Sequence, residues 1–509
     1  MIILILVVLA VILFHYVKRI YSFWERQNFP YDQNSKIPYG CLESVAKHKK
    51  SMGMTMYDVY LRSKERFLGV YLLFRPAILV RDVDLVRHVL AEDFASFHDR
   101  GIYVDEEKDP LSANIFSLEG KSWRDMRIKL APLFTSGKLK AMFSTSEEVG
   151  DRMIAHLNTL IPEKGTMKID LKEIFTTYAI DIIGSTIFGL DINSFENPTN
   201  KFRNIVRLSH KNTHPAAILG MLLYLFPSLV KFLFRKFGLK NPVALEMLKI
   251  VKDTIEYREK HNIVRKDMLQ LLMQLKNTGK IEEDDNFDAK VTKKAGSFIE
   301  NISIETITAQ AFVFYIAGQE STASAAALTI FELAQYPDIL KKVTEEVNRV
   351  LAENNGKITY ETLQKMEYLE LCINETLRKY PSLPLMNRIC TQDYQIPGSD
   401  KIIKKGTNVL ISLFGIHRDP EHFPDPEIYI PERFLPENSN YNPKAYMPFG
   451  EGPRHCIAQR MGKINSKLGV VKILQNFNIE IMPKQDIEID NYSILIVPKG
   501  GVNVRLSKK

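Results

Sequence analysis

Four residues near the C-terminal end of the chain have types and a spacing that could bind iron through sulfur. They form the pattern F-x-x-G-x-R-x-C and are Phe449, Gly452, Arg454 and Cys456. Such a pattern arises by chance in about one chain in a thousand or fewer. If the sulfur binds a haem iron, the glycine lets backbone amides approach the thiolate, the arginine can pair with a haem propionate, and the aromatic ring packs beside the sulfur. A thiolate ligand also favours cleavage of an O–O bond.

A second segment could move protons. The stretch AQAFVFYIAGQESTASAAALTIFELAQYP, residues 309–337, is apolar enough to predict a buried helix. Ala317 and the glycine after it thin this helix where a ligand would need room, and glycine there costs about 1 kcal/mol relative to alanine. Glu320, Ser321 and Thr322 follow, so an acid and an alcohol could relay protons beside the gap. The alternative is a set of solvated polar residues on a kinked helix.

A third pattern, E-x-x-R, occurs three times, as Glu346/Arg349, Glu375/Arg378 and Glu451/Arg454. Most such pairs are exposed ion pairs worth about 0.2–0.5 kcal/mol. Glu375 and Arg378 stand out because they end an amphipathic helical pattern and are followed by a Tyr-Pro pair and later by PERF, residues 431–434. The context favours this pair as the structural one.

Together, the three patterns resemble the cytochrome P-450 superfamily of haem-thiolate monooxygenases, and their details resemble its insect microsomal detoxification members. The resemblance runs from the N-terminal apolar run to the end of the chain. It implies a heme b cofactor with Cys456 as the axial ligand of the iron, O2 as co-substrate, and Phe449 and Ala317 next to the haem. Ala458 stands where the family usually has glycine, and alanine is a frequent variant there.

The resemblance also implies roles for the other two patterns. Arg433 of PERF is expected to join Glu375 and Arg378 in a buried structural network, and breaking such a network costs roughly 3–5 kcal/mol. Glu320 with Ser321 and Thr322 is expected to relay the protons. Ser321 fills a position that is usually threonine, and serine lacks the methyl group that restricts the rotamer, so the coupling of electron use to product formation is in question.

Further contacts follow from the resemblance. The expected partners of the haem propionates are Trp123 and Arg127 in a W-x-x-x-R pattern, Arg388, Arg454 and Arg100. The expected substrate contacts are apolar or aromatic, which suits a lipophilic ligand, and they are Ile115, Phe116, Phe312, Ala317, Leu383, Leu385, Ile494 and Leu495. Each of these residues alone could equally be ordinary core. His417, His422 and His455 are interpreted as surface or capping residues rather than ligands.

The sequence has no G-x-G-x-x-G motif after a strand, so the electrons must come from a partner. The family implies an NADPH-dependent, membrane-bound flavoprotein reductase. A cationic docking face is expected around the Trp123 helix, with Lys121, Arg124, Lys129, Lys138 and Lys140. The alternative for these residues is an ordinary solvated face.

The composition agrees with an enzyme large enough to hold such a site. The chain has 509 residues, 45% hydrophobic and 25% charged, which excludes disorder. A net charge of +8 without a block of like charges argues against a nucleic-acid-binding tail. Four cysteines without C-x-x-C spacing argue against zinc and disulfides. Helical patterns with short strand-like runs predict a mainly α protein with minor β, in a single large P-450-like fold.

The first seventeen residues carry no charge and are followed at once by Lys18 and Arg19. They would span roughly 25 Å as a helix. Because no basic residues precede them and no cleavage site follows, we expect a retained membrane anchor with the rest of the chain in the cytoplasm, at the endoplasmic reticulum by resemblance. The alternative is a buried core helix. The predicted domains are an anchor at 1–17, a Pro/Gly hinge at 18–40 and a catalytic domain at 41–509.

A second apolar stretch, residues 216–230, is interrupted by proline and followed by cations, which favours a surface that rests on the membrane. Two other functions stay open beside the monooxygenase. A haem-thiolate isomerase or dehydratase would need no O2, and it would have no use for the acid and hydroxyl residues. A non-catalytic membrane haem sensor is the other alternative.

Overall fold

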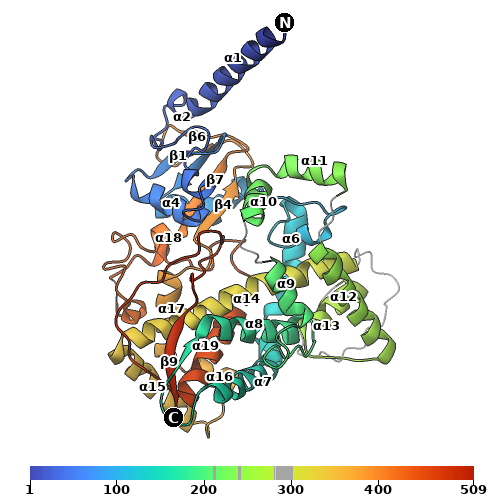
Figure 1. The fold of residues 1–509 in the computed structure, drawn as a ribbon, viewed down its shortest axis with the longest axis vertical. Coiled ribbons are helices and arrows are strands. Elements are labelled where there is room, and N and C mark those ends of the chain that lie inside the picture. Colours follow the sequence, from blue (N-terminus) through green and yellow to red (C-terminus); the bar gives the residue numbers. More distant parts are fainter. Residues whose placement is uncertain (210–213, 239–241, 280, 282–301, 439) are drawn as a thin grey trace.

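The computed structural model describes residues 1–509 except 210–213, 239–241, 280, 282–301 and 439. Figure 1 shows a mainly helical body with small sheets and one helix that projects from it at the N-terminus. This confirms the predicted fold class.

The helices, in chain order, are α1 (Ile2–Tyr21), α2 (Phe23–Arg26), α3 (Glu43–Ala46), α4 (Met52–Leu61), α5 (Val83–Arg87), α6 (Gly120–Leu130), α7 (Ser136–Leu160), α8 (Leu171–Ile187), α9 (Lys201–Ser209), α10 (His214–Leu225), α11 (Pro227–Phe237), α12 (Pro242–His261), α13 (Met268–Thr278), α14 (Ile304–Gln335), α15 (Pro337–Ala352), α16 (Tyr360–Gln364), α17 (Glu367–Lys379), α18 (Leu413–Ile416) and α19 (Gln459–Asn476). Short helical turns include η3 (Pro110–Ser112) and η5 (Pro431–Phe434).

The strands are β1 (Phe67–Leu72), β2 (Arg75–Val80), β3 (Met167–Asp170), β4 (Leu385–Ile389), β5 (Tyr394–Gln395), β6 (Ile402–Ile403), β7 (Asn408–Ser412), β8 (Phe477–Ile479) and β9 (Asn503–Lys508). One sheet has the order β1-β2-β7-β4, with β2 and β7 parallel and the other pairs antiparallel. A second has the order β3-β9-β8, and β5 pairs with β6. In the first sheet, β4 lies beside β7 with Arg388 opposite Val409.

Helix α14 crosses the body and is surrounded by other helices (Figure 1). Ser303 caps its first turn by accepting a hydrogen bond from the backbone N–H of Thr306. Alanines at 323 and 325–327, among the strongest helix formers, carry it through the core, and it ends before Pro337. One hydrophobic cluster surrounds this helix and another surrounds the sheet that contains β1 and β2.

Helix α1 is long and apolar enough to cross a membrane, with a mean hydropathy of 2.3 and none of its residues buried. It ends at Tyr21, four residues beyond the predicted end of the anchor. The segment predicted as a hinge lies against the body because its aromatic residues have apolar partners there. Trp24 is 3% exposed and its indole Nε1 donates to the carbonyl of Val70, while Phe29 is also buried.

Candidate functional site

The loop before α19 brings Cys456 back toward Phe449. The backbone N–H of Cys456 donates to the carbonyl of Phe449 at 2.8 Å. Gly452 has a φ of +71°, and a Cβ atom there would lie 1.9 Å from the carbonyl oxygen of Leu90. Only glycine fits this position, since both the left-handed backbone and the close approach of Leu90 exclude a side chain.

Cys456 is exposed, unlike the buried cysteines Cys41, Cys372 and Cys390. Burial raises its pKa, whereas the backbone N–H of Ala458 and the nearby cations Arg127 and Arg100 act in the opposite direction. The backbone N–H of Ala458 and the two cations thus partly offset the effect of burial, which is the larger one.

The guanidinium group of Arg100 lies near the thiol of Cys456, and those of Arg388 and Arg454 lie near Arg100; all three arginines are buried. Burial and the neighbouring cations lower the pKa of Arg100 well below its usual range, and burial with Arg454 lowers the pKa of Arg388 to about 9. The Nε atom of each of the three has no hydrogen-bond partner among the described residues. Arg454 pairs with Asp99 at 3.4 Å, but the structure gives no ion pair to Arg100 or Arg388 among the described residues, so the cluster has room for anions, because buried like charges are unfavourable.

The predicted propionate partners thus lie together, and their donor set fits a dicarboxylate. Arg454 also stacks its guanidinium carbon 4.3 Å from the centre of the Trp123 ring and donates to the carbonyl of Leu118 at 2.7 Å. Arg127 donates to the carbonyl of His455 at 3.0 Å, next to the cysteine. A thiol, four cations and an indole at one site match the needs of a haem with its two propionates.

In the middle of α14, Ala317 and Ser321 are accessible to solvent, whereas Glu320 is buried. Ala317 is exposed and Ser321 half-buried, and the Ser321 hydroxyl donates to the Ala317 carbonyl at 2.7 Å. Ser321 and Thr322 line a small cavity with Phe449, so α14 and the cysteine loop share this space.

Glu320 is buried and already has partners. Its carboxylate lies 2.9 Å from the ammonium of Lys172 in α8 and accepts a hydrogen bond from the hydroxyl of Ser324 at 2.8 Å. No hydrogen bond joins it to Ser321 within the described part of the chain. Sequence reasoning missed Lys172, and no sequence pattern singled it out within the first turn of α8.

The E-x-x-R pair of α17 lies in a buried network. Arg378 donates to both oxygens of Glu375, at 2.7 and 2.9 Å, and Arg433 of η5 donates to the same carboxylate at 3.2 Å. All three side chains are 3% exposed or less. Arg378 further donates to the carbonyl of His417 at 2.8 Å.

His417 is fully buried, so the interpretation of it as a surface residue is wrong. Its Nδ1 lies 3.2 Å from the carbonyl of Arg378, and its Nε2 accepts from the backbone N–H of Met447 at 3.1 Å. Burial lowers its pKa to about 3, so the ring is neutral and can bridge α17 to the segment that leads to Phe449. Its role is to connect the two motifs.

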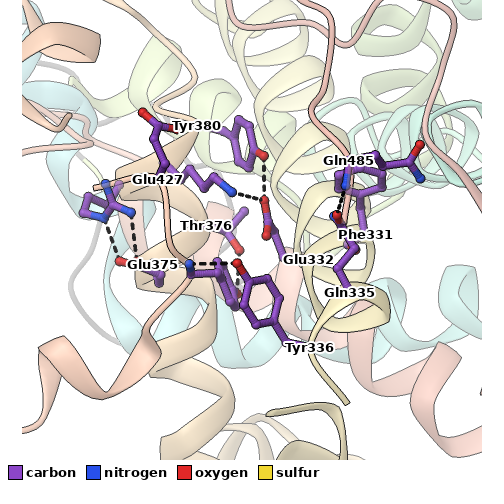
Figure 2. A network of polar contacts seen from close by, with 12 residues as sticks. Phe331, Glu332, Gln335, Tyr336, Glu375, Thr376, Tyr380, Glu427 and Gln485 are labelled. Carbon is purple, nitrogen blue, oxygen red and sulfur yellow. Dashed lines mark hydrogen bonds and ion pairs between the residues drawn. The ribbon is translucent and has the colours of Figure 1, made fainter. Parts of the chain in front are cut away.

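A second buried contact joins α14 to the end of α17. Figure 2 shows Tyr380 pointing its hydroxyl at the carboxylate of Glu332, and that hydrogen bond is 2.6 Å long. Lys379 also donates to Glu332 at 2.9 Å. The helix of the relay residues is thereby tied to the helix of the E-x-x-R pair, a contact that the sequence patterns did not reveal.

The predicted substrate residues come from segments that meet at α14 and β4. Ile115 is buried, Phe116 is 38% exposed, and Phe312 and Leu385 are half-buried. The backbone N–H of Ile496, after Leu495, donates to the carbonyl of Ser382, just before Leu383, at 2.9 Å. Ile494 is 72% exposed, so its side chain does not pack against the body as the side chain of Ile115 does.

Helix α11 contacts the loop that precedes Ile115, at Val104 and Asp105. Arg235 donates to both oxygens of Asp105, at 2.7 and 2.8 Å, and lowers the pKa of that fully buried carboxyl to about 2. The ammonium of Lys231 donates to the carbonyl of Val104 at 3.0 Å. Leu229 and Phe232 of the same helix are more than half exposed, so its other face is apolar.

The predicted cationic face is smaller than expected. Lys121 and Arg124 of α6 are exposed, and Lys129 is half-buried. Lys138 is 1% exposed because it begins a helix that packs into the core, so it cannot contribute to a docking surface. The ammonium of Lys140 lies 2.5 Å from the carboxylate of Glu361.

Comparisons with known proteins agree with this geometry. A family model described as Cytochrome P450 matches residues 37–504. "Probable cytochrome P450 6d4" of Drosophila melanogaster is 62% identical over 507 residues, which cover 100% of this chain and 98% of that protein. "Cytochrome P450 6d3" of Musca domestica is 49% identical over 518 residues, covering 100% and 99%. "Cytochrome P450 6a2" of Drosophila melanogaster is 33% identical over 511 residues, covering 99% and 98%.

Proposed function

Since the chain belongs to the cytochrome P450 monooxygenase family, we propose that it is a microsomal enzyme that inserts one oxygen atom of O2 into lipophilic substrates. The substrates proposed are xenobiotics such as plant toxins or insecticides, or endogenous lipids or hormones. The electrons come from an NADPH-dependent flavoprotein reductase.

One observation carries the proposal: Cys456 lies beside buried arginines that have too few anionic partners. Heme b would satisfy both needs, with Cys456 as ligand of the iron and the propionates between Arg100, Arg388 and Arg454. Trp123 and Arg127 would complete the propionate contacts from α6. The bound haem supplies the activation of O2 and the transfer of one oxygen atom to the substrate.

The residues of this chain then bind, orient and deliver protons. Ala317 leaves room beside α14, and the hydroxyls of Ser321 and Thr322 can pass protons into that space. Glu320 is the acid of the relay in this proposal, and its carboxylate lies 2.9 Å from the ammonium of Lys172 within the core. To hand on a proton, the Glu320 carboxyl must exchange one of its present partners.

Three surfaces support the cellular setting of the proposal. Helix α1 suits an anchor in the endoplasmic reticulum membrane, with the body on the cytoplasmic side. The exposed apolar face of α11 suits contact with the same bilayer. Lys121, Arg124 and Lys129 would meet an acidic reductase, because charge complementarity steers such encounters.

The test begins with the haem-loaded protein reduced under carbon monoxide. We expect the Soret shift of a thiolate-bound haem, its loss in Cys456→Ala, and its retention in Cys41→Ala, a matched change of a buried cysteine in the sheet region. Survival of the shift in Cys456→Ala would contradict the ligand assignment.

Turnover of lipophilic probes should then require NADPH, the reductase and O2. Turnover without them would favour an isomerase or dehydratase, and haem binding without any turnover would favour a sensor. Glu320→Ala should release more hydrogen peroxide per NADPH consumed, because protons arrive less efficiently. Unchanged coupling would remove Glu320 from the relay.

A further inference from the structure

We propose that Gln310 fixes one wall of the substrate pocket and thereby limits the length of the molecules that bind there. This inference rests on the proposed function, because it takes the space beside Ala317 as the place where a substrate reacts. Gln310 acts as a positioning residue that holds the loop of Ile115 and Phe116.

The side chain of Gln310 forms a two-point bridge from α14 to this loop. Its Oε1 accepts the backbone N–H of Ile115 at 2.8 Å, and its Nε2 donates to the carbonyl of Ala113 at 3.2 Å. Gln310 itself is 0% exposed. In a buried setting, an unpaired backbone N–H or carbonyl is costly, so the backbone at Ala113 and Ile115 depends on this one carboxamide.

The chemistry of the bridge requires glutamine. The residue between the two bonded groups, Asn114, cannot take over the contact because its own amide donates to the carbonyl of Leu111 at 2.8 Å. Glutamate at position 310 would keep an acceptor but lose the donor to Ala113, and methionine would keep the size but lose both.

The far end of the same loop is held by the arginine cluster. The carbonyls of Phe116 and Leu118 accept hydrogen bonds from Arg454, at 3.4 and 2.7 Å. The guanidinium carbon of Arg100 lies 4.0 Å from the centre of the Phe116 ring. The loop therefore runs from α14 to the cysteine side, and Gln310 decides where Ile115 lies across the pocket.

Helix geometry gives the length limit. Gln310 and Ala317 are seven residues apart in one helix, which is nearly two turns, so both lie on the same face about 10 Å apart along the axis. A molecule that reacts beside Ala317 and extends along α14 in this direction meets the bridge at that distance. A longer molecule must open the bridge.

The experiment uses the full-length, haem-loaded protein and a series of imidazoles with linear alkyl chains of increasing length, whose binding is followed in the haem spectrum. In the parent protein, affinity should rise about fourfold with each added methylene until the chain reaches the bridge, and then stop rising. In Gln310→Met, the rise should continue to longer chains. An unchanged break point in this variant would overturn the proposal.

A matched control is Gln335→Met, the same change of a buried glutamine at the other end of α14. It should keep the break point of the parent protein, and a shifted break point there would show that any loss of a buried amide on this helix has the same effect. Gln310→Glu should shift the break point less than Gln310→Met, because the acceptor for Ile115 remains.

Hydrogen exchange gives a readout that does not depend on the ligand spectrum. The amide of Ile115 should exchange about fivefold faster in Gln310→Met than in the parent, because one hydrogen bond is lost. In the parent itself, an alkyl chain longer than the break point should speed this exchange and a shorter one should not. The measurement on the parent needs no variant, so it tests the proposal even if Gln310→Met fails to fold.

The failures can be told apart. A parent protein without the thiolate-type carbon monoxide spectrum would overturn the proposed function and this inference with it. A normal spectrum combined with an unchanged break point and unchanged exchange at Ile115 would overturn only the role of Gln310.

Discussion

The cysteine side of the site and the substrate-pocket loop are held by different kinds of contact. On the cysteine side, Glu375, Arg378 and Arg433 are charged and almost fully buried. Between residues 104 and 115, the loop depends on the neutral amide of Gln310 and on Arg235, which is 41% exposed. The cysteine side must therefore stay intact as a unit, whereas the contacts of the loop can open at lower cost.

The largest effect is expected from Arg378→Ala. It leaves the Glu375 carboxylate buried with only Arg433 as a cation, so unfolding free energy should fall by about 3–5 kcal/mol in urea titrations. The matched control is Arg349→Ala, in another E-x-x-R copy, whose exposed pair with Glu353 should change stability by less than about 1 kcal/mol. Equal losses in both variants would contradict the difference between the copies.

The next largest effect is expected from the protonation of His417, which should make the stability of the protein depend on pH. Its pKa is about 3 in the folded protein and 6.5 when free, so the unfolded chain binds more protons between these values. Stability should thus fall as pH decreases from about 6.5 toward 3, by at most about 1.4 kcal/mol per pH unit, and this contribution should stop changing below 3. His417→Gln should lack this slope in urea titrations at successive pH values, and an identical slope would exclude His417 as its source.

On the loop, Arg235→Ala should lower the free energy of unfolding by about 1–3 kcal/mol, because it leaves the Asp105 carboxyl buried without its cation. Amide exchange should rise at residues 104–109 and stay unchanged near Cys456. The pKa of Asp105 is lowered to about 2, so the pair contributes stability above about pH 4 that is lost as pH falls toward 2. Lys236→Ala, an exposed cation on the same helix, is the control and should leave that exchange unchanged.

The smallest effect is expected from Ser321→Thr. Both residues can donate to the Ala317 carbonyl, and the added methyl group only narrows the rotamer choice. Peroxide released per NADPH should fall less than twofold. Ser321→Ala removes the hydroxyl and should raise peroxide release, so the reverse order of the two variants would contradict a proton-carrying role for this side chain.

The sequence predicted the family and the fold class correctly because the signals for them lie close together in the chain. The F-x-x-G-x-R-x-C spacing and the Ala-Gly gap are local patterns. Of the predicted propionate partners, Arg127, Arg388 and Arg454 lie near Arg100, and their roles stay predictions. The prediction that Lys138 belongs to a cationic docking face was wrong, because a basic pattern does not show which side of a helix packs inward. The E-x-x-R choice needed flanking residues, since three copies have the same spacing.

The sequence by itself determined the fold class, the family and the candidate ligand Cys456, because short motifs with strict chemical requirements carry that information. Only the tertiary structure decided which partners those residues have. Lys172 and Glu320 are 148 residues apart, and Gln310 and Ile115 are 195 apart. Hydrogen bonds and ion pairs depend on atoms within about 3 Å, and no local pattern specifies which distant segments come that close.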